Sequence, residues 1–308
     1  MSSSSDFGPG AFLCYQLLRQ MDRASDGKKI VYETEFNKLC FLAYKELEEE
    51  GYADEIELPM RWYQFGMEVW GQPEAFAVSY QRDERGTKVI PQTLSDSAFS
   101  LREELEEVIY RVTRKLAGQY KHTYGTDTIV DDTYESYAPT QFVESYHEFR
   151  NDIERLESNQ QSLTQFMDST ASEGHISTVR SHLETLVEAY PTSTYDEAYS
   201  EFKQWDSVTR QLAKNGDVAA LISLSEEFWV MFSRVELRIH HNVDIPARTI
   251  ADWILERDRH KEEFRTQLKE YRQIALEGRE KTNHLDRISE PYSKAVRRMA
   301  RDKTDCRN

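Results

Sequence analysis

The chain has 308 residues, of which 39% are hydrophobic and 12% aromatic, and its formal net charge is −16. Disordered chains lack this much apolar and aromatic surface, so the composition excludes disorder and predicts a folded protein. The length allows one large domain or two of ordinary size.

The N-terminal part of the chain predicts two helices. After a Ser-rich start, residues 11–21 carry apolar side chains at helical spacing. A second helix is predicted from Glu33 to a stop near Gly51, and its last turns are strongly acidic. A third helix with the same apolar spacing is expected over residues 101–116.

Between the second and third helices the sequence favours strands. Residues 58–66 alternate large apolar and polar side chains and end on Gly66, as a short strand does. Two β-prone runs, 75–80 and 87–90, flank Asp83-Glu84-Arg85-Gly86 and predict a hairpin. Two helices followed by a small hairpin outline a winged-helix domain. We therefore expect a winged-helix-like α+β module over residues 1–120.

The remainder of the chain reads as long helices. Gly, Asp and Pro break the periodicity over residues 121–140, which we interpret as a linker. Beyond it, apolar residues recur at spacings of three and four within 142–167, 195–212, 221–239 and 250–275. Such stripes are typical of a helical bundle or an antiparallel coiled coil, which we expect over residues 141–308. The overall class is therefore mainly α.

The charge balance indicates a high-salt environment. Fifty-five acidic residues oppose 39 basic ones, and only 14 of the basic residues are Lys. A lysine-poor, acidic surface keeps a protein hydrated at high salt, so we expect a halophilic source; an ordinary acidic cytosolic protein is the alternative. At molar ionic strength charges are screened beyond ~3 Å, which weakens long-range electrostatic arguments about partners.

Cysteine usage and the absence of export signals predict a cytoplasmic protein. Cys14 and Cys40 lie in apolar helical patterns and should be buried, whereas Cys306 lies in a polar tail. The three form no CxxC pair, so neither a disulfide framework nor a cysteine zinc site is predicted. The sequence has no basic segment followed by an apolar run at its start, and no apolar stretch of about 18 residues that could span a membrane.

The sequence contains no catalytic motif, and we expect neither an enzyme nor a cofactor. GxSxG, GxxxxGK[ST] and GxGxxG are all absent. Glu144 and His147 form one ExxH pair, but di-iron bundles need two such pairs. His240 and His241 are adjacent, and neighbouring residues on a helix point about 100° apart, so we interpret them as the end of a helix and predict no metal site.

Two segments carry the basic residues that could meet nucleic acid. The predicted hairpin contains Arg82, Arg85 and Lys88. Residues 279–308 have nine basic and five acidic side chains and an apolar helical stripe. This C-terminal helix could bind phosphates, an anionic membrane surface or an acidic partner helix, or dock on the acidic bundle of its own chain. Its nucleic-acid candidates are Arg297, Arg298 and Arg301.

Two segments resemble the Panacea family, which is known from SocA-like antitoxins and phage-associated proteins. They are Phe36-Asn37-Lys38-Leu39-Cys40-Phe41-Leu42-Ala43, which is similar to that family's "KLLYFA" helix, and Trp62-Tyr63-Gln64-Phe65-Gly66-Met67-Glu68-Val69. The second departs from the family pattern because no Pro follows Gly66. Similar segments occur in haloarchaeal proteins, in agreement with the charge balance. The resemblance covers about 80 residues and implies a winged-helix-like module that grips a partner protein.

Two functions remain as alternatives. The long helices and the absence of site chemistry favour a non-enzymatic protein-interaction or regulatory protein, antitoxin-like in the sense of the resemblance, with a homo-oligomer through the long helices as a further expectation. Its partner-binding candidates are Trp62, Tyr63, Phe65 and Trp70, because aromatic side chains dominate protein interfaces. The alternative is a DNA-binding winged-helix regulator. Residues 1–95 hold ten basic and sixteen acidic residues, a net charge of −6, which disfavours contact with phosphates.

Overall fold

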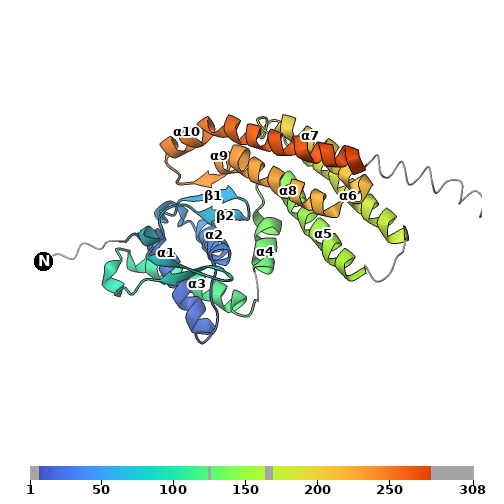
Figure 1. The fold of residues 1–308 in the computed structure, drawn as a ribbon. Coiled ribbons are helices and arrows are strands. Elements are labelled where there is room, and N and C mark those ends of the chain that lie inside the picture. The colour runs from blue at the N-terminus through green and yellow to red at the C-terminus, as the bar shows by residue number, and fades with distance from the viewer. Residues whose placement is uncertain (1–6, 124–125, 164–168, 279–308) are drawn as a thin grey trace, which may run out of the picture. The chain divides into compact units, whose positions relative to one another are not determined.

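A computed structural model describes residues 7–123, 126–163 and 169–278. The secondary structure confirms the mainly α class, with small antiparallel sheets near the N-terminal region (Figure 1). The helices are α1 (Pro9–Ala24), α2 (Glu33–Glu49), α3 (Glu103–Tyr120), α4 (Asp127–Tyr137), α5 (Gln141–Leu163), α6 (Ser169–Ala189), α7 (Tyr199–Asn215), α8 (Val218–Phe232), α9 (Arg238–His240) and α10 (Ala247–Leu255), followed by a helix over 257–278. The strands are β1 (Met60–Tyr63), β2 (Gly66–Val69), β3 (Val78–Asp83), β4 (Gly86–Pro91) and β5 (Asn242–Val243).

The chain folds into two compact units that do not follow the predicted domain boundaries. Of the described residues, unit 1 comprises those within 1–144 and 232–257, and unit 2 comprises those within 145–231 and 258–308. Residues 232–257 belong to unit 1 because β5 pairs with β1, an interaction between segments far apart in sequence. The stretch 121–140, predicted as a linker, contains α4, which buries Ile129 and Tyr134. Three Asp residues of α4, Asp127, Asp131 and Asp132, are exposed or half-buried. Because α4 is short and rich in such polar residues, its apolar periodicity is not evident in the sequence.

In unit 1, helices α1, α2 and α3 pack on one another (Figure 1). Cys14 of α1 and Cys40 of α2 are fully buried, as predicted, with their sulfur atoms 3.7 Å apart. Gly10 allows the start of α1 to approach the chain closely, because a Cβ there would lie 2.3 Å from the carbonyl oxygen of Glu57. This packing provides the base on which the strands lie.

A three-stranded antiparallel sheet in the order β2-β1-β5 covers α2. Along β1 the side chains alternate, with Met60 and Trp62 buried and Arg61 and Tyr63 half-buried. The Trp62 ring packs edge-to-face on Phe41 of α2 and Tyr134 of α4, at centroid distances of 6.3 and 5.3 Å. One face of β1, with Met60 and Trp62, therefore belongs to the core, and the other face carries the half-buried Arg61 and Tyr63.

The hairpin predicted around Asp83 and Gly86 is confirmed as β3 and β4. Its register pairs Val78 with Pro91 at one end and Asp83 with Gly86 at the turn. The Asp83 carboxylate accepts hydrogen bonds from the backbone N–H groups of Arg85 and Gly86, at 2.8 and 3.1 Å. This local bonding explains why an Asp-x-x-Gly sequence forms the turn.

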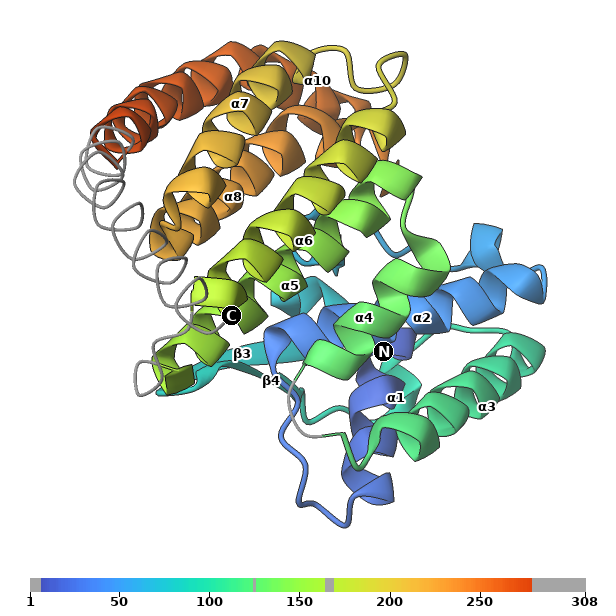
Figure 2. The same cartoon turned by 90° about the vertical axis from the view of Figure 1, so that its right-hand side faces the viewer.

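Unit 2 consists of long helices (Figure 2), and their buried side chains form an aromatic core. The predicted stripes supply this core: Tyr146 of α5, Trp205 of α7 and Phe228 of α8 are all fully buried. The Tyr146 ring stacks on Trp229 at 4.8 Å, and its hydroxyl donates to the Ser225 carbonyl oxygen at 2.8 Å. The apolar spacing thus identified the buried face of α5, α7 and α8.

The predicted stripe over 250–275 is not one continuous helical face. Helix α10 ends at Leu255, and the chain turns at Glu256 before the helix over 257–278 begins. Ile254 is 44% exposed, whereas Phe264 and Leu268 are buried. Only the second half of the stripe therefore contributes to unit 2.

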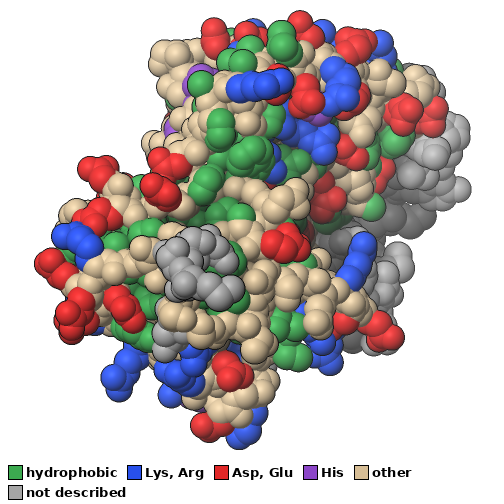
Figure 3. Space-filling view, turned by 90° about the vertical axis from the view of Figure 1, so that its left-hand side faces the viewer, with side chains coloured by type: hydrophobic (Ala, Val, Ile, Leu, Met, Phe, Trp, Pro, Cys, Tyr) green, Lys and Arg blue, Asp and Glu red, His purple; other side chains and the backbone are tan. Residues whose placement is uncertain are grey.

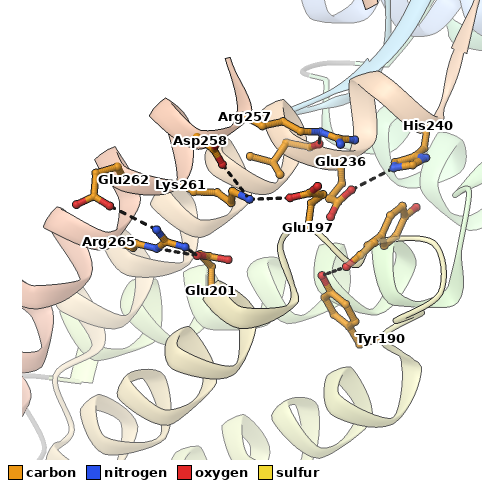
Figure 4. A network of polar contacts seen from close by, with 12 residues as sticks. Tyr190, Glu197, Glu201, Glu236, His240, Arg257, Asp258, Lys261, Glu262 and Arg265 are labelled. Carbon is orange, nitrogen blue, oxygen red and sulfur yellow. Dashed lines mark hydrogen bonds and ion pairs between the residues drawn. The ribbon is translucent and has the colours of Figure 1, made fainter. Parts of the chain in front are cut away.

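Two ion pairs join the helix over 257–278 to the segment around the start of α7 (Figure 4). Lys261 donates to Glu197 at 2.7 Å, and Arg265 donates to Glu201 through Nε at 2.8 Å. Glu201 is completely buried, while the Arg265 side chain is 41% exposed. The guanidinium therefore compensates a carboxylate that has no access to water.

Candidate partner-binding face

The β1–β2 hairpin places the four predicted aromatic residues in different environments. Trp62 lies in the core at 2% exposure, Tyr63 and Trp70 are half-buried, and Phe65 is 53% exposed. We expected strand alternation to continue to Phe65, but it ends at Tyr63, because Gln64 and Phe65 form the turn between β1 and β2. Phe65 is therefore at the tip of the hairpin and not on a sheet face.

Gly66 makes this tight turn possible. Its φ angle is +87°, in the region that favours glycine. A Cβ at this position would lie 3.2 Å from Nζ of Lys38 and 3.3 Å from the Trp62 ring. The glycine thus lets the hairpin pack closely on α2 while Phe65 points to solvent.

Arg61 organises the outer face of the sheet. Its guanidinium lies over the rings of Tyr63 and Trp253, 4.8 and 5.1 Å from their centroids, and its Nη2 is 2.7 Å from a carboxylate oxygen of Glu68. The Tyr63 hydroxyl accepts a hydrogen bond from Nε of Arg234 at 3.1 Å. Cation–π contacts of this kind hold flat side chains in fixed orientations.

On the outer face of the sheet, Trp253 of α10 also contacts a second arginine, Arg238, and a second tryptophan, Trp70. The Arg238 guanidinium lies 5.1 Å from the Trp253 ring centroid and donates to Glu256 at 3.1 Å. Burial lowers the pKa of Arg238, and Glu256 opposes this effect. Trp70 meets Trp253 edge-to-face at 6.1 Å and 88°. We call these six residues the aromatic–arginine face: Arg61, Tyr63, Phe65, Trp70, Arg238 and Trp253. Arg238 and Trp253 are buried within it, each at 7% exposure.

Two side chains of α2 occupy the outer edge of β2. Asn37 accepts a hydrogen bond from the Val69 N–H at 3.0 Å, and Lys38 donates to the Met67 carbonyl oxygen at 2.6 Å. Lys38 is 1% exposed, and this burial lowers its pKa to about 7, although the charge of Glu68 acts in the opposite direction. An edge strand with free backbone groups is a template for pairing with another chain. Asn37 and Lys38 therefore protect β2 from strand addition.

The basic residues proposed for nucleic-acid contact are placed unevenly. Arg82 and Arg85 are exposed near the β3–β4 turn. Lys88 is bound to Asp83, with Nζ 2.8 Å from the carboxylate, so its charge is compensated within the hairpin. Arg297, Arg298 and Arg301 lie outside the described residues.

His147 and His241 are hydrogen-bonded within the protein, the first through its side chain and the second through its backbone. His147 is bonded to Asn151 at 3.2 Å, and the His241 carbonyl oxygen accepts from the Trp62 N–H at 2.8 Å. Burial, followed by the charge of His240, lowers the pKa of His241 to about 4. In the described ranges, no three His, Cys, Asp or Glu side chains are grouped as a metal site would require. Among these residues there is also no helix long and apolar enough to cross a membrane.

Sequence reasoning missed Arg61, Arg238 and Trp253, although they organise the outer face of the sheet. Arg238 and Trp253 are about 180 residues from the hairpin in sequence, and only the pairing of β5 with β1 brings them there. Figure 3 shows hydrophobic side chains interspersed with charged ones on one side of the molecule.

Comparison with protein-family models, with curated proteins and with solved structures gave no match to this chain.

Proposed function

We propose that this chain is a non-enzymatic protein-interaction or regulatory protein, whose partner protein binds at the aromatic–arginine face. The observation that carries this proposal is Phe65, a large aromatic ring that is 53% exposed at the tip of the β1–β2 hairpin. Exposed aromatic rings beside arginines are typical of interface hot spots, where single side chains contribute about 2 kcal/mol or more. We regard unit 1 as the winged-helix-like, antitoxin-like module that the sequence suggests.

The contacts of the β1–β2 hairpin support an ordered docking surface. Gly66 fixes the turn, and the Arg61 guanidinium holds the rings of Tyr63 and Trp253 in place. A partner that buries Phe65 therefore pays little entropy for ordering its binding site. The β2 edge is bonded to Asn37 and Lys38, so we expect recognition through side chains and not through strand addition.

Substitution of Phe65 tests the proposal. Phe65→Ser removes the ring from an exposed position, and Val187→Ser changes a similarly exposed residue (49%) of α6 as a matched control. Affinity purification of the full chain from its native cells, at native salt, should recover a partner with wild type and with Val187→Ser. Recovery should fall at least about tenfold with Phe65→Ser, as expected for about 1.4 kcal/mol of lost binding. Equal recovery of that partner by all three proteins would contradict the proposal.

A DNA-binding regulator remains the second candidate because Arg82 and Arg85 are exposed near the turn of a wing-like hairpin. The compensation of Lys88 by Asp83 and the net charge of −6 over residues 1–95 argue against it. If it is correct, duplex DNA should bind with an affinity that falls steeply with salt, and Arg82→Gln with Arg85→Gln should weaken that binding.

A further inference from the structure

A cavity of about 500 Å³ opens in unit 1, away from the strands that carry the aromatic–arginine face. It is bounded by the end of α1, the start of α2 and Arg85 of the β3–β4 turn, and by residues 121–123 and Thr126 near the end of α3 and the start of α4. This volume is within the range of about 300–1,000 Å³ that is common for small-molecule sites.

The lining of this cavity is basic, in contrast to the chain as a whole. Four lining residues are cationic, Lys28, Lys29, Arg85 and Lys121, and two are acidic, Asp26 and Glu35. The formal balance is 4 − 2 = +2, before any protonation of His122, in a chain of net charge −16. A local excess of positive charge in an acidic protein needs an explanation.

Lys29 and Glu35 form a fixed, buried pair within the lining. Nζ of Lys29 is 2.5 Å from the Glu35 carboxylate and also donates to the Tyr120 carbonyl oxygen at 2.6 Å and to Oγ1 of Thr123 at 3.0 Å. The two side chains are only 9% and 5% exposed. Glu35 is therefore compensated internally and does not neutralise the other cations of the cavity.

The other three cations make no ion pair with any residue in the described ranges. Lys28 and Arg85 are exposed, and Lys121 is half-buried at the end of α3. Only Asp26 among the lining residues remains to balance them. Three cations around one cavity repel one another, and an anion that contacts all three would relieve this repulsion.

The cavity also has an apolar side. Ile30 is 47% exposed and lies in the lining, and Tyr32, two residues further along the chain and half-buried, also lines the cavity. We infer that this cavity binds a small phosphate ester with an apolar or aromatic part, such as a nucleotide, with the phosphate on Lys28, Arg85 and Lys121 and the remainder against Ile30 and Tyr32. Charge-assisted hydrogen bonds from Lys and Arg are the usual means of holding phosphate.

Calorimetric titration of the full chain tests this inference. The probes are the four common ribonucleoside diphosphates, inorganic pyrophosphate, adenosine and a short DNA duplex, at low and at molar salt. We expect at least one diphosphate to bind more tightly than pyrophosphate, and adenosine to bind weakly or not at all. Lys28→Gln, Arg85→Gln and Lys121→Gln together should weaken that binding at least about tenfold.

A charge-matched control distinguishes binding in the cavity from binding to exposed cations elsewhere on the surface. Lys203→Gln, Arg248→Gln and Lys269→Gln together remove three exposed cations that do not line the cavity and should leave the affinity within about twofold of wild type. Acetylation of lysine amines provides a second readout on the wild-type protein, without any substitution. The bound nucleotide should protect Lys28 and Lys121 from acetylation, but not Lys203. The inference is overturned if no diphosphate binds, if binding survives the cavity substitutions, or if the DNA duplex binds more tightly than every nucleotide.

Discussion

The Lys38 ammonium group donates a 2.6 Å hydrogen bond to the carbonyl oxygen of Met67, and through this bond a buried lysine of α2 closes part of the open edge of β2. Its neighbour Asn37 accepts from the Val69 N–H two residues along the same edge. Helix α2 is therefore bonded directly to the hairpin whose tip carries Phe65. These two bonds attach the backbone of β2 to α2 beside the turn that exposes Phe65.

Burial of Lys38 predicts a pH dependence of stability. Its pKa is lowered from the ordinary 10.5 to about 7, so between these values the unfolded chain binds more protons than the folded one. The free energy of unfolding should therefore rise with pH over this window, by up to about 1.4 kcal/mol per pH unit. Denaturant unfolding between pH 7.5 and pH 9.5, roughly the centre of that window, measures this rise. It should be absent in Lys38→Met, and an identical rise in wild type and variant would show that another group is responsible.

Trp70 and Trp253 should stabilise unit 1 through each other. Their edge-to-face contact at 6.1 Å links the end of β2 to α10. Single substitutions to Ala should each lower the free energy of unfolding, and a double-mutant cycle should give a coupling of about 1 kcal/mol. A coupling near zero would mean that the two rings act independently and that α10 is held by the arginines alone.

Arg265→Met should destabilise unit 2 because it leaves the Glu201 carboxylate buried without its partner. Breaking a buried ion pair from one side costs about 3 kcal/mol or more. Arg259→Met is the matched control, since Arg259 and Glu263 are 62% and 54% exposed, and it should cost less than about 1 kcal/mol. Glu201→Gln in the Arg265→Met background should restore part of the loss, because a neutral amide is less costly to bury than a carboxylate. Equal effects of the two Arg substitutions in thermal or denaturant unfolding would contradict this assignment.

Cys14 and Cys40 should be unreactive in the folded protein. Both are fully buried, and burial together with the neighbouring Cys14 sulfur raises the pKa of the Cys40 thiol well above its ordinary value. In a Cys306→Ser variant, Ellman's reagent should detect no thiol under native conditions and both thiols after denaturation. Rapid native reaction of either cysteine would show that α1 and α2 open readily.

The sequence predicts features that depend on short-range pattern and fails for those that depend on long-range pairing. The β3–β4 turn follows from Asp83 and Gly86, which bond to each other locally, and the buried faces of α5 and α7 follow from their apolar spacing. The return of residues 232–257 to unit 1 depends on two residue pairs between β5 and β1, which no local pattern reveals. For the same reason Phe65 could be selected as a site residue, whereas Trp253 and Arg238 could not.

The central claim, that a partner protein docks on the hairpin tip, is tested most directly by photo-crosslinking at residue 65. Phe65 is replaced by p-benzoylphenylalanine, which keeps an aromatic ring at the tip, and the same residue at position 187 serves as the control. After illumination of native cells, position 65 should give an adduct with one other protein, identified by mass spectrometry, that position 187 does not give. No protein adduct at position 65, or adducts only with a second copy of this chain, would contradict the account.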